Sequence, residues 1–308
     1  MIEVKNLLRK YGEKIAVHNI SFSVERGKIW GFLGPNGAGK TTTMRILTGY
    51  LPPTEGEAYI AGYDVVKYPL RAKTHIGYLP EIPPLYNDMT VKGYIGFVAE
   101  LKGMKGKEKQ RGVGAAIEKT GLAPVKKRLI KNLSKGFRQR VGIAQAIVND
   151  PAVLILDEPT IGLDPAQIIE IRELIKSLKE NHTVILSTHI LPEVTQTCDG
   201  VVIINEGQLR AAGSISELQK KFKEQKGIYI KTEPALEMGQ LQMVAGVKSV
   251  KADGNGYKIY WEDESLGEKA LFEYVKVKDV LLKEWRIITP TLEDLYLKIV
   301  SSDKGGIQ

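Results

Sequence analysis

Gly34-Pro35-Asn36-Gly37-Ala38-Gly39-Lys40-Thr41 is the stretch that decides the fold of this chain. It fits the pattern of a phosphate-binding loop, whose glycines let the backbone wrap closely so that several N–H groups point at phosphates. In that pattern Lys40 adds a positive charge near the β- and γ-phosphates, and the Thr41 hydroxyl is placed for Mg²⁺. The stretch and the following Thr42 therefore predict a nucleotide phosphate site. A glycine turn before an ordinary helix is the alternative.

The segments on either side of this loop support the phosphate site. An apolar run at 29–33 predicts a strand before the loop, and the pattern at 42–47 predicts a helix after it, which would offer its positive end to an anion. Apolar, β-branched runs at 153–156 and 184–186 predict strands buried on both faces of a parallel sheet, and a helical spacing at 168–178 lies between them. This alternation predicts an α/β fold.

Two acids follow one of these predicted strands, in Ala152-Val153-Leu154-Ile155-Leu156-Asp157-Glu158. The strand would deliver Asp157 to the carboxyl edge of the sheet, where ligands bind in such folds. Asp157 would hold Mg²⁺ through water, and Glu158 would orient or deprotonate the attacking water. Two acids after a strand are often only a helix cap, but together with the phosphate loop they predict nucleotide hydrolysis.

The rest of the chain predicts a helical insertion and a second domain. Residues from about 85 to 150 are mostly helical in pattern, and we interpret the glycine- and lysine-rich break at 102–107 as a mobile loop. The C-terminal pattern has the order βαββαβ of a small ferredoxin-like α+β domain, followed by an apolar stripe on a final helix. The predicted organisation is a first domain at 1–218, a linker at 219–227 and an accessory domain at 228–308.

Composition narrows the function classes. A chain of 308 residues suggests two domains at roughly 100–200 residues each. Its single cysteine, Cys198, cannot form an internal disulfide and indicates a reducing compartment. The net charge is +8 with only 7% aromatic residues, which favours a solvated lysine-rich surface over a base-stacking strip, so we expect no nucleic-acid partner. No signal-peptide core or apolar run of roughly 18 residues is present, so we expect the chain itself not to span a membrane.

With these motifs in order, residues 1 to about 218 resemble the ATP-binding subunits of ABC transporters. The resemblance rests on the phosphate loop and on four further segments, which are Leu133-Ser134-Lys135-Gly136-Phe137-Arg138-Gln139-Arg140, Leu154-Ile155-Leu156-Asp157-Glu158-Pro159-Thr160, Gly162-Leu163-Asp164-Pro165 and Ser187-Thr188-His189. It implies a P-loop NTPase fold, with a RecA-like core, an antiparallel β subdomain and a helical subdomain. The implied cofactors are ATP and Mg²⁺.

The resemblance also implies how two chains share ATP. Ser134 and Gly136 stand where a helix would begin, so a hydroxyl, backbone N–H groups and the helix dipole form an anion site. In the family this signature site completes the ATP pocket of the opposite subunit in a head-to-tail dimer, and Asp164 matches the loop that couples the two sites. Here Lys135 replaces the usual glycine and Phe137 the usual glutamine.

Three more residues take their roles from the resemblance alone. His189 matches the histidine that reaches the γ-phosphate. Tyr11 matches the aromatic residue that stacks on adenine, and because stacking tolerates different bases, GTP is a possible second substrate. Glu81, in Ile76-Gly77-Tyr78-Leu79-Pro80-Glu81, matches the loop that links Mg²⁺ to the membrane partner, where the family usually has glutamine. A carboxylate still offers oxygen to a hard cation.

The expected function is an ATPase that powers transport through a separate integral membrane permease. The ending Thr291-Leu292-Glu293-Asp294-Leu295-Tyr296-Leu297 resembles that of subunits that pair with ABC-2-type permeases, which favours export. The expected location is the cytoplasmic face of the cell membrane, reached through the permease. An ABC ATPase that acts on ribosomes or chromosomes is the alternative. A GTPase is disfavoured because the chain has no Asn-Lys-x-Asp.

Overall fold

The computed structural model describes residues 1–221, 227–278, 280–288, 292, 293 and 296. The chain divides into two compact units, Met1–Ile215 and Ser216–Gln308. The helix α8 (Ile215–Lys221) begins at this division, so the predicted linker starts inside a helix instead of following it. The linker's residues 222–226 lie outside the described residues.

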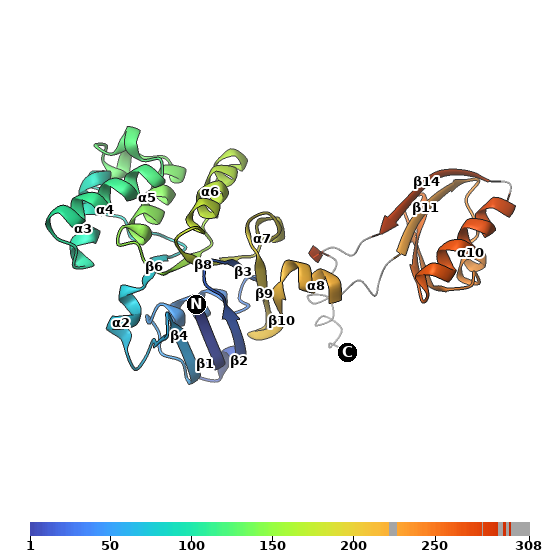
Figure 1. The fold of residues 1–308 in the computed structure, drawn as a ribbon, viewed down its shortest axis with the longest axis horizontal. Coiled ribbons are helices and arrows are strands. Elements are labelled where there is room, and N and C mark those ends of the chain that lie inside the picture. Colours follow the sequence, from blue (N-terminus) through green and yellow to red (C-terminus); the bar gives the residue numbers. More distant parts are fainter. Residues whose placement is uncertain (222–226, 279, 289–291, 294–295, 297–308) are drawn as a thin grey trace. The chain divides into compact units, whose positions relative to one another are not determined.

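The first unit is built on a six-stranded sheet with the order β10-β9-β3-β8-β7-β6 (Figure 1). All neighbours in it run parallel except the edge pair β10 and β9. Its strands are β3 (Ile29–Leu33), β6 (Ile76–Leu79), β7 (Val153–Asp157), β8 (Thr183–Thr188), β9 (Gly200–Asn205) and β10 (Gln208–Ser214). The predicted α/β fold with a parallel sheet is confirmed.

The strand β7, which lies between β8 and β6, shows why the run from Val153 to Leu156 is apolar at every position. Val153 and Ile155 belong to one hydrophobic core, which lies against the antiparallel sheet and the helix after the phosphate loop. Leu154 and Leu156 belong to a second core, which lies against the helical subdomain. Since alternate side chains of a strand point to opposite faces, both faces of the sheet are buried.

The antiparallel sheet has the order β2-β1-β4-β5. Its strands are β1 (Ile2–Tyr11), β2 (Lys14–Val24), β4 (Glu55–Ile60) and β5 (Tyr63–Asp64). The helix α1 (Lys40–Leu47) contributes Met44, Ile46 and Leu47 to the core that this sheet shares with the parallel sheet. The phosphate loop is therefore held between two sheets.

The helical subdomain groups α3 (Val91–Leu101), α4 (Gly106–Lys119) and α5 (Lys135–Ile147), drawn in green in Figure 1. At the break predicted at 102–107, the structure has a short turn that leads into α4. Met104 is buried in the core, and Lys102 Nζ donates to Asn149 Oδ1 at 2.7 Å and to Ile76 O at 3.3 Å. The remaining helices of the first unit are α2 (Pro69–Thr74), α6 (Pro165–Leu178) and α7 (Leu191–Thr197).

The second unit has the predicted βαββαβ order, which is confirmed. Its strands pair antiparallel in the order β12-β13-β11-β14, and Ile228, Ile230, Ile259 and Leu271 lie in its core. The elements are β11 (Gly227–Glu233), α9 (Met238–Gln242), β12 (Val247–Asp253), β13 (Gly256–Trp261), α10 (Glu264–Val277) and β14 (Leu281–Ile288). Most of the predicted final helix lies outside the described residues.

Among the residues that the structure describes, no helix combines the length and apolar character needed to cross a bilayer.

Candidate functional site

Four neighbouring strands end at one edge of the parallel sheet, and each is followed by a residue singled out from the sequence. The phosphate loop follows β3, His189 follows β8, Glu158 follows β7, and Glu81 follows β6. A pocket of 560 Å³ lies at this edge. Its lining includes Tyr11, Asn36, Gly37, Gly39, Lys40, Thr41, Thr42, Glu81, Glu158 and His189. Parallel pairing thus gathers residues that are up to 153 positions apart in the chain, from Asn36 to His189, and Tyr11 joins them from the end of the antiparallel strand β1.

The phosphate loop takes a backbone shape that demands glycine at two positions. Gly37 and Gly39 have φ angles of 80° and 100°. A Cβ on Gly39 would lie 2.4 Å from the carbonyl oxygen of Ala16, so no larger residue fits there. Gly39 is the residue before α1, and Lys40 is the first residue of that helix. The free N–H groups and the positive dipole end of α1 therefore face the loop, as an anion site requires.

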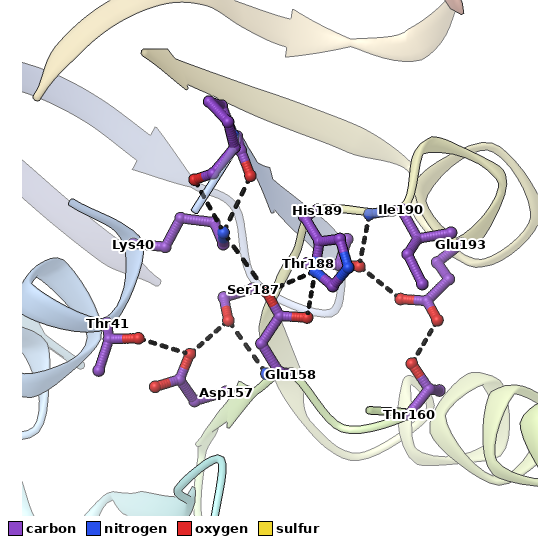
Figure 2. A network of polar contacts seen from close by, with 12 residues as sticks. Lys40, Thr41, Asp157, Glu158, Thr160, Ser187, Thr188, His189, Ile190 and Glu193 are labelled. Carbon is purple, nitrogen blue, oxygen red and sulfur yellow. Dashed lines mark hydrogen bonds and ion pairs between the residues drawn. The ribbon is translucent and has the colours of Figure 1, made fainter. Parts of the chain in front are cut away.

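The side chain of Lys40 is held inside the loop and is only 6% exposed. Its ammonium donates to the carbonyl oxygens of Gly34 at 2.9 Å and Pro35 at 3.2 Å. It also lies 3.4 Å from Glu158 Oε1, on the opposite side of the pocket (Figure 2). The loop thus presents a desolvated positive charge whose counter-ion is the carboxylate predicted to act on water.

Asp157 is fully buried at the end of β7, and its two oxygens have different surroundings. Oδ1 accepts hydrogen bonds from the hydroxyls of Ser187 and Thr41, the latter at 3.5 Å. Oδ2 is buried and has no hydrogen-bond partner among the described residues. A buried carboxylate oxygen without a partner, beside a threonine hydroxyl, fits the oxygen-rich site that Mg²⁺ prefers. These residues therefore fit the predicted metal.

Glu158 has a strained backbone that several contacts hold in place. Its φ angle is 48°, in the left-handed region that a side chain disfavours. Its N–H donates to Ser187 Oγ at 3.0 Å and to Ser187 O at 3.2 Å. Its carboxylate lies 3.0 Å from His189 Nδ1. A strained backbone persists only where surrounding contacts restrain it. Here these contacts hold the Glu158 carboxylate in the pocket.

Tyr11 and Glu81 lie at the rim of the pocket. Tyr11 is 44% exposed, and the guanidinium of Arg9 lies 4.8 Å from its ring centroid, so that one face of the ring is covered. Three residues before Glu81 in the chain, burial and the charge of Asp157 raise the pKa of Tyr78 to about 12. An aromatic ring at the rim can stack on a base.

The structure does not bring the remaining predicted residues into this pocket. Ser134 caps α5, with its hydroxyl accepting from the Phe137 N–H at 3.4 Å, and it is exposed. Asp164 caps α6, with Oδ1 accepting from the Gln167 N–H at 2.9 Å. Gly136 is buried against the Gln167 side chain. These three residues form a second, separate group at two adjoining helix starts.

Three buried residues without a predicted role lie close behind the pocket, namely Ser187, Glu193 and Gln139. Ser187 holds both Asp157 and Glu158. Glu193 accepts hydrogen bonds from two threonines, and Gln139 Nε2 donates to Pro159 O at 2.7 Å. The sequence offered one hint of such roles, because Ser187 and Thr188 are polar residues at the end of a strand that is buried at every position.

Comparisons with known proteins agree with this geometry. A family model described as "ABC transporter" matches residues 17–161, and one described as "ATP-binding protein DrrA1-3-like, C-terminal domain" matches residues 213–300. An uncharacterized ABC transporter ATP-binding protein of Bacillus subtilis, YxlF, is 33% identical over 97% of this chain and 99% of its own length. The bacitracin transport ATP-binding protein BcrA of Bacillus licheniformis is 39% identical over 72% of each chain.

Solved structures show the same likeness for the first unit. A structure titled as the ATP binding subunit of an ABC transporter is 31% identical and has a TM-score of 0.66, covering 72% of this chain and 93% of that one. A dimeric, post-hydrolysis structure of the cassette MJ0796 with ADP and Pi is 25% identical and has a TM-score of 0.63, covering 70% of this chain and 98% of that one.

Proposed function

Because this chain belongs to the ATP-binding proteins of ABC transporters and is an ATPase of that family, we propose that it powers export through a separate membrane permease. The observation that carries the proposal is the convergence of Lys40, Glu158 and His189 on one pocket at the ends of adjacent strands, with Asp157 buried beside Thr41. The second unit supports the exporter part, since it matches the DrrA1-3-like C-terminal model.

Nucleotide binding rests on the phosphate loop. The N–H groups of the loop and the start of α1 would surround the phosphates, and Lys40 would contribute its charge in a largely dry site. Tyr11 would stack on the base. Thr41 and Asp157 would hold Mg²⁺, with Glu81 at the rim as a further oxygen ligand, and the ion would supply charge neutralisation to the phosphates.

Hydrolysis rests on Glu158. When ATP enters, phosphate oxygens compete with Glu158 for the Lys40 ammonium. The Glu158 carboxylate, released from that ion pair, would then accept a proton from the attacking water. His189 contacts the same carboxylate through Nδ1, which leaves its other ring nitrogen to face the γ-phosphate. Binding of ATP would thereby switch Glu158 from a partner of Lys40 to a general base.

Two chains would share each ATP in a head-to-tail dimer. Ser134 and Gly136 lie outside the pocket of their own chain, at the start of the 13-residue helix α5, where the hydroxyl and dipole can meet a phosphate held by a second chain. Asp164 lies beside them at the start of α6 and would couple the two sites. The MJ0796 cassette is dimeric with ADP and Pi bound, which supports a dimer for this chain as well.

Affinity purification of the tagged full chain from detergent-solubilised membranes tests the transporter part. The expected result is an integral membrane protein with several apolar spans in stoichiometric amount. Recovery with ribosomes and without a membrane protein would overturn it in favour of a ribosome-associated ATPase. A tagged Lys40→Ala chain serves as a control, because docking to the permease should not require ATP binding.

A further inference from the structure

Glu193, in the first turn of α7, is a buried acid that the mechanism above does not use. It is only 2% exposed, and its carboxylate accepts from the Thr188 hydroxyl at 2.6 Å and from the Thr160 hydroxyl (Figure 2). Both threonines are themselves buried. A carboxylate in such a place is costly unless its oxygens are hydrogen-bonded, and here each oxygen has one donor.

The two threonines belong to the segments that carry the proposed catalytic pair. Thr160 lies two residues after Glu158, and Thr188 directly precedes His189. The Thr188 hydroxyl also accepts from the Ile190 N–H at 3.0 Å, so it holds both sides of His189. Glu193 therefore joins the loop after β7 to the end of β8 through two hydrogen bonds.

Glu158 needs such support more than an ordinary residue does. With a φ angle of 48°, its backbone returns to a relaxed conformation unless neighbouring segments restrain it. Its N–H is restrained by Ser187 and the following Pro159 carbonyl by Gln139. The contact of Thr160 with Glu193 restrains the loop from a third side. Like the Ser187 contact, it ties this loop to the segment that carries His189, and it does so through α7, since Glu193 also binds Thr188.

We propose that Glu193 is a positioning residue for ATP hydrolysis, whose buried carboxylate locks Glu158 and His189 into their mutual geometry through Thr160 and Thr188. The inference rests on the proposed roles of Glu158 and His189. It assigns no contact between Glu193 and nucleotide, since Glu193 does not line the pocket. Its loss should therefore act on the rate of hydrolysis and leave nucleotide binding intact.

We call Glu193, together with its hydrogen bonds to Thr160 and Thr188, the clamp. A matched pair of substitutions at Thr160 tests the clamp in the full-length chain. Thr160→Val keeps the shape of the side chain and removes the hydroxyl, whereas Thr160→Ser keeps the hydroxyl. We expect Thr160→Val to lower kcat by about tenfold or more, because small displacements of catalytic groups are that costly. KM and the affinity for ATP should stay within about twofold. Thr160→Ser should keep kcat near the parental value. Equal kcat values for both variants, whether lowered or parental, would overturn the proposal.

Glu193→Gln provides an independent test, since the glutamine keeps the size of the side chain and removes its negative charge and one of its two acceptor oxygens. Its kcat should fall, and the loss in the double variant with Thr160→Val should be smaller than the sum of the two single losses, because both residues belong to one hydrogen-bonded network. Additive losses would contradict the clamp. If Glu193→Gln does not fold, the Thr160 pair still decides. Glu158→Gln separates the two hypotheses: if it hydrolyses ATP normally, the proposed role of Glu158 fails, whereas if it is inactive while Thr160→Val is active, only the clamp fails.

Discussion

The ammonium of Lys40 lies 3.4 Å from Glu158 Oε1, and the two side chains are only 6% and 8% exposed. A buried ion pair of this kind is costly to break on one side, because the remaining charge is left without a partner. In the proposed mechanism, the phosphates of ATP replace Glu158 as the counter-ion of Lys40. Each charge thus neutralises the other in the dry pocket until the phosphates of ATP bind Lys40.

Lys40→Ala should abolish tight ATP binding. The phosphates would lose a nearby positive charge in a poorly solvated site, and an attraction of several kcal/mol corresponds to a loss in affinity on the order of 10²-fold or more. Isothermal titration with ATP measures the effect directly. Lys5→Ala is a suitable control, since Lys5 pairs with Glu3 on β1 and does not line the pocket. An affinity that matches the parental chain would refute the phosphate-loop assignment.

Glu158→Gln should bind ATP and hydrolyse it about 10²- to 10⁴-fold more slowly, because the amide keeps the size of the carboxylate and cannot take a proton. The change also removes a negative charge that repels the γ-phosphate. ATP should therefore persist, and at high protein concentration the variant should form an ATP-dependent dimer, seen as a shift in sedimentation. A parental hydrolysis rate would remove Glu158 from the mechanism.

Adding Ser134→Arg to Glu158→Gln should abolish that shift. Ser134 is an exposed cap at the start of α5, so a larger side chain there should leave the fold intact and fill the space meant for the partner's phosphate. ATP affinity of the double variant, measured at low protein concentration, should equal that of Glu158→Gln. A dimer that survives the substitution would mean that its interface does not use the signature segment.

A chain that ends at Lys226 should still bind ATP. The residues that line the pocket all belong to Met1–Ile215, which has its own two hydrophobic cores. The second unit would then act on dimerisation or regulation and not on nucleotide contact. Circular dichroism reports whether the shortened chain folds, and titration reports its affinity. A well-folded fragment without ATP binding would show that the second unit belongs to the site.

Stability should depend on pH through Lys102. Burial lowers the pKa of this amine from 10.5 to about 8. Since the unfolded chain then binds more protons than the folded chain between these two values, stability rises with pH across that window. The penalty for the charged amine is full below the lower pKa and disappears above the upper one. The melting temperatures of the parental chain and of Lys102→Met should be measured from about pH 7 to 10. The two curves should converge or cross, because only the parental chain gains stability from Lys102 as the pH rises.

Lys105→Met is the matched control, because Lys105 is exposed and lies in the same turn between α3 and α4. Its melting curve should run parallel to that of the parental chain. A Lys102→Met curve that also runs parallel across the whole range would contradict the role of Lys102.

The sequence predicted the fold and most of the pocket because the signals involved are local. Gly37 and Gly39 have left-handed backbones that few other residues adopt, and the run from Val153 to Leu156 is apolar at every position because both faces of its strand are buried. The βαββαβ order of the second unit followed from the alternation of short apolar patterns. The glycine- and lysine-rich pattern at 102–107 gave no sign that Met104 is buried or that the Lys102 amine is hydrogen-bonded.

By itself, the sequence determined the family and predicted which residues carry the chemistry, since a motif states the residue types and their spacing. The tertiary structure alone decided which of them meet. Strand order β3-β8-β7-β6 places Lys40, His189 and Glu158 in one pocket and leaves Ser134 and Asp164 outside it. It also creates the contacts of Ser187 and Glu193, which join segments about 30 residues apart. Such contacts have no periodicity, because a hydrogen bond between buried side chains depends on which chain segments the sheet brings together.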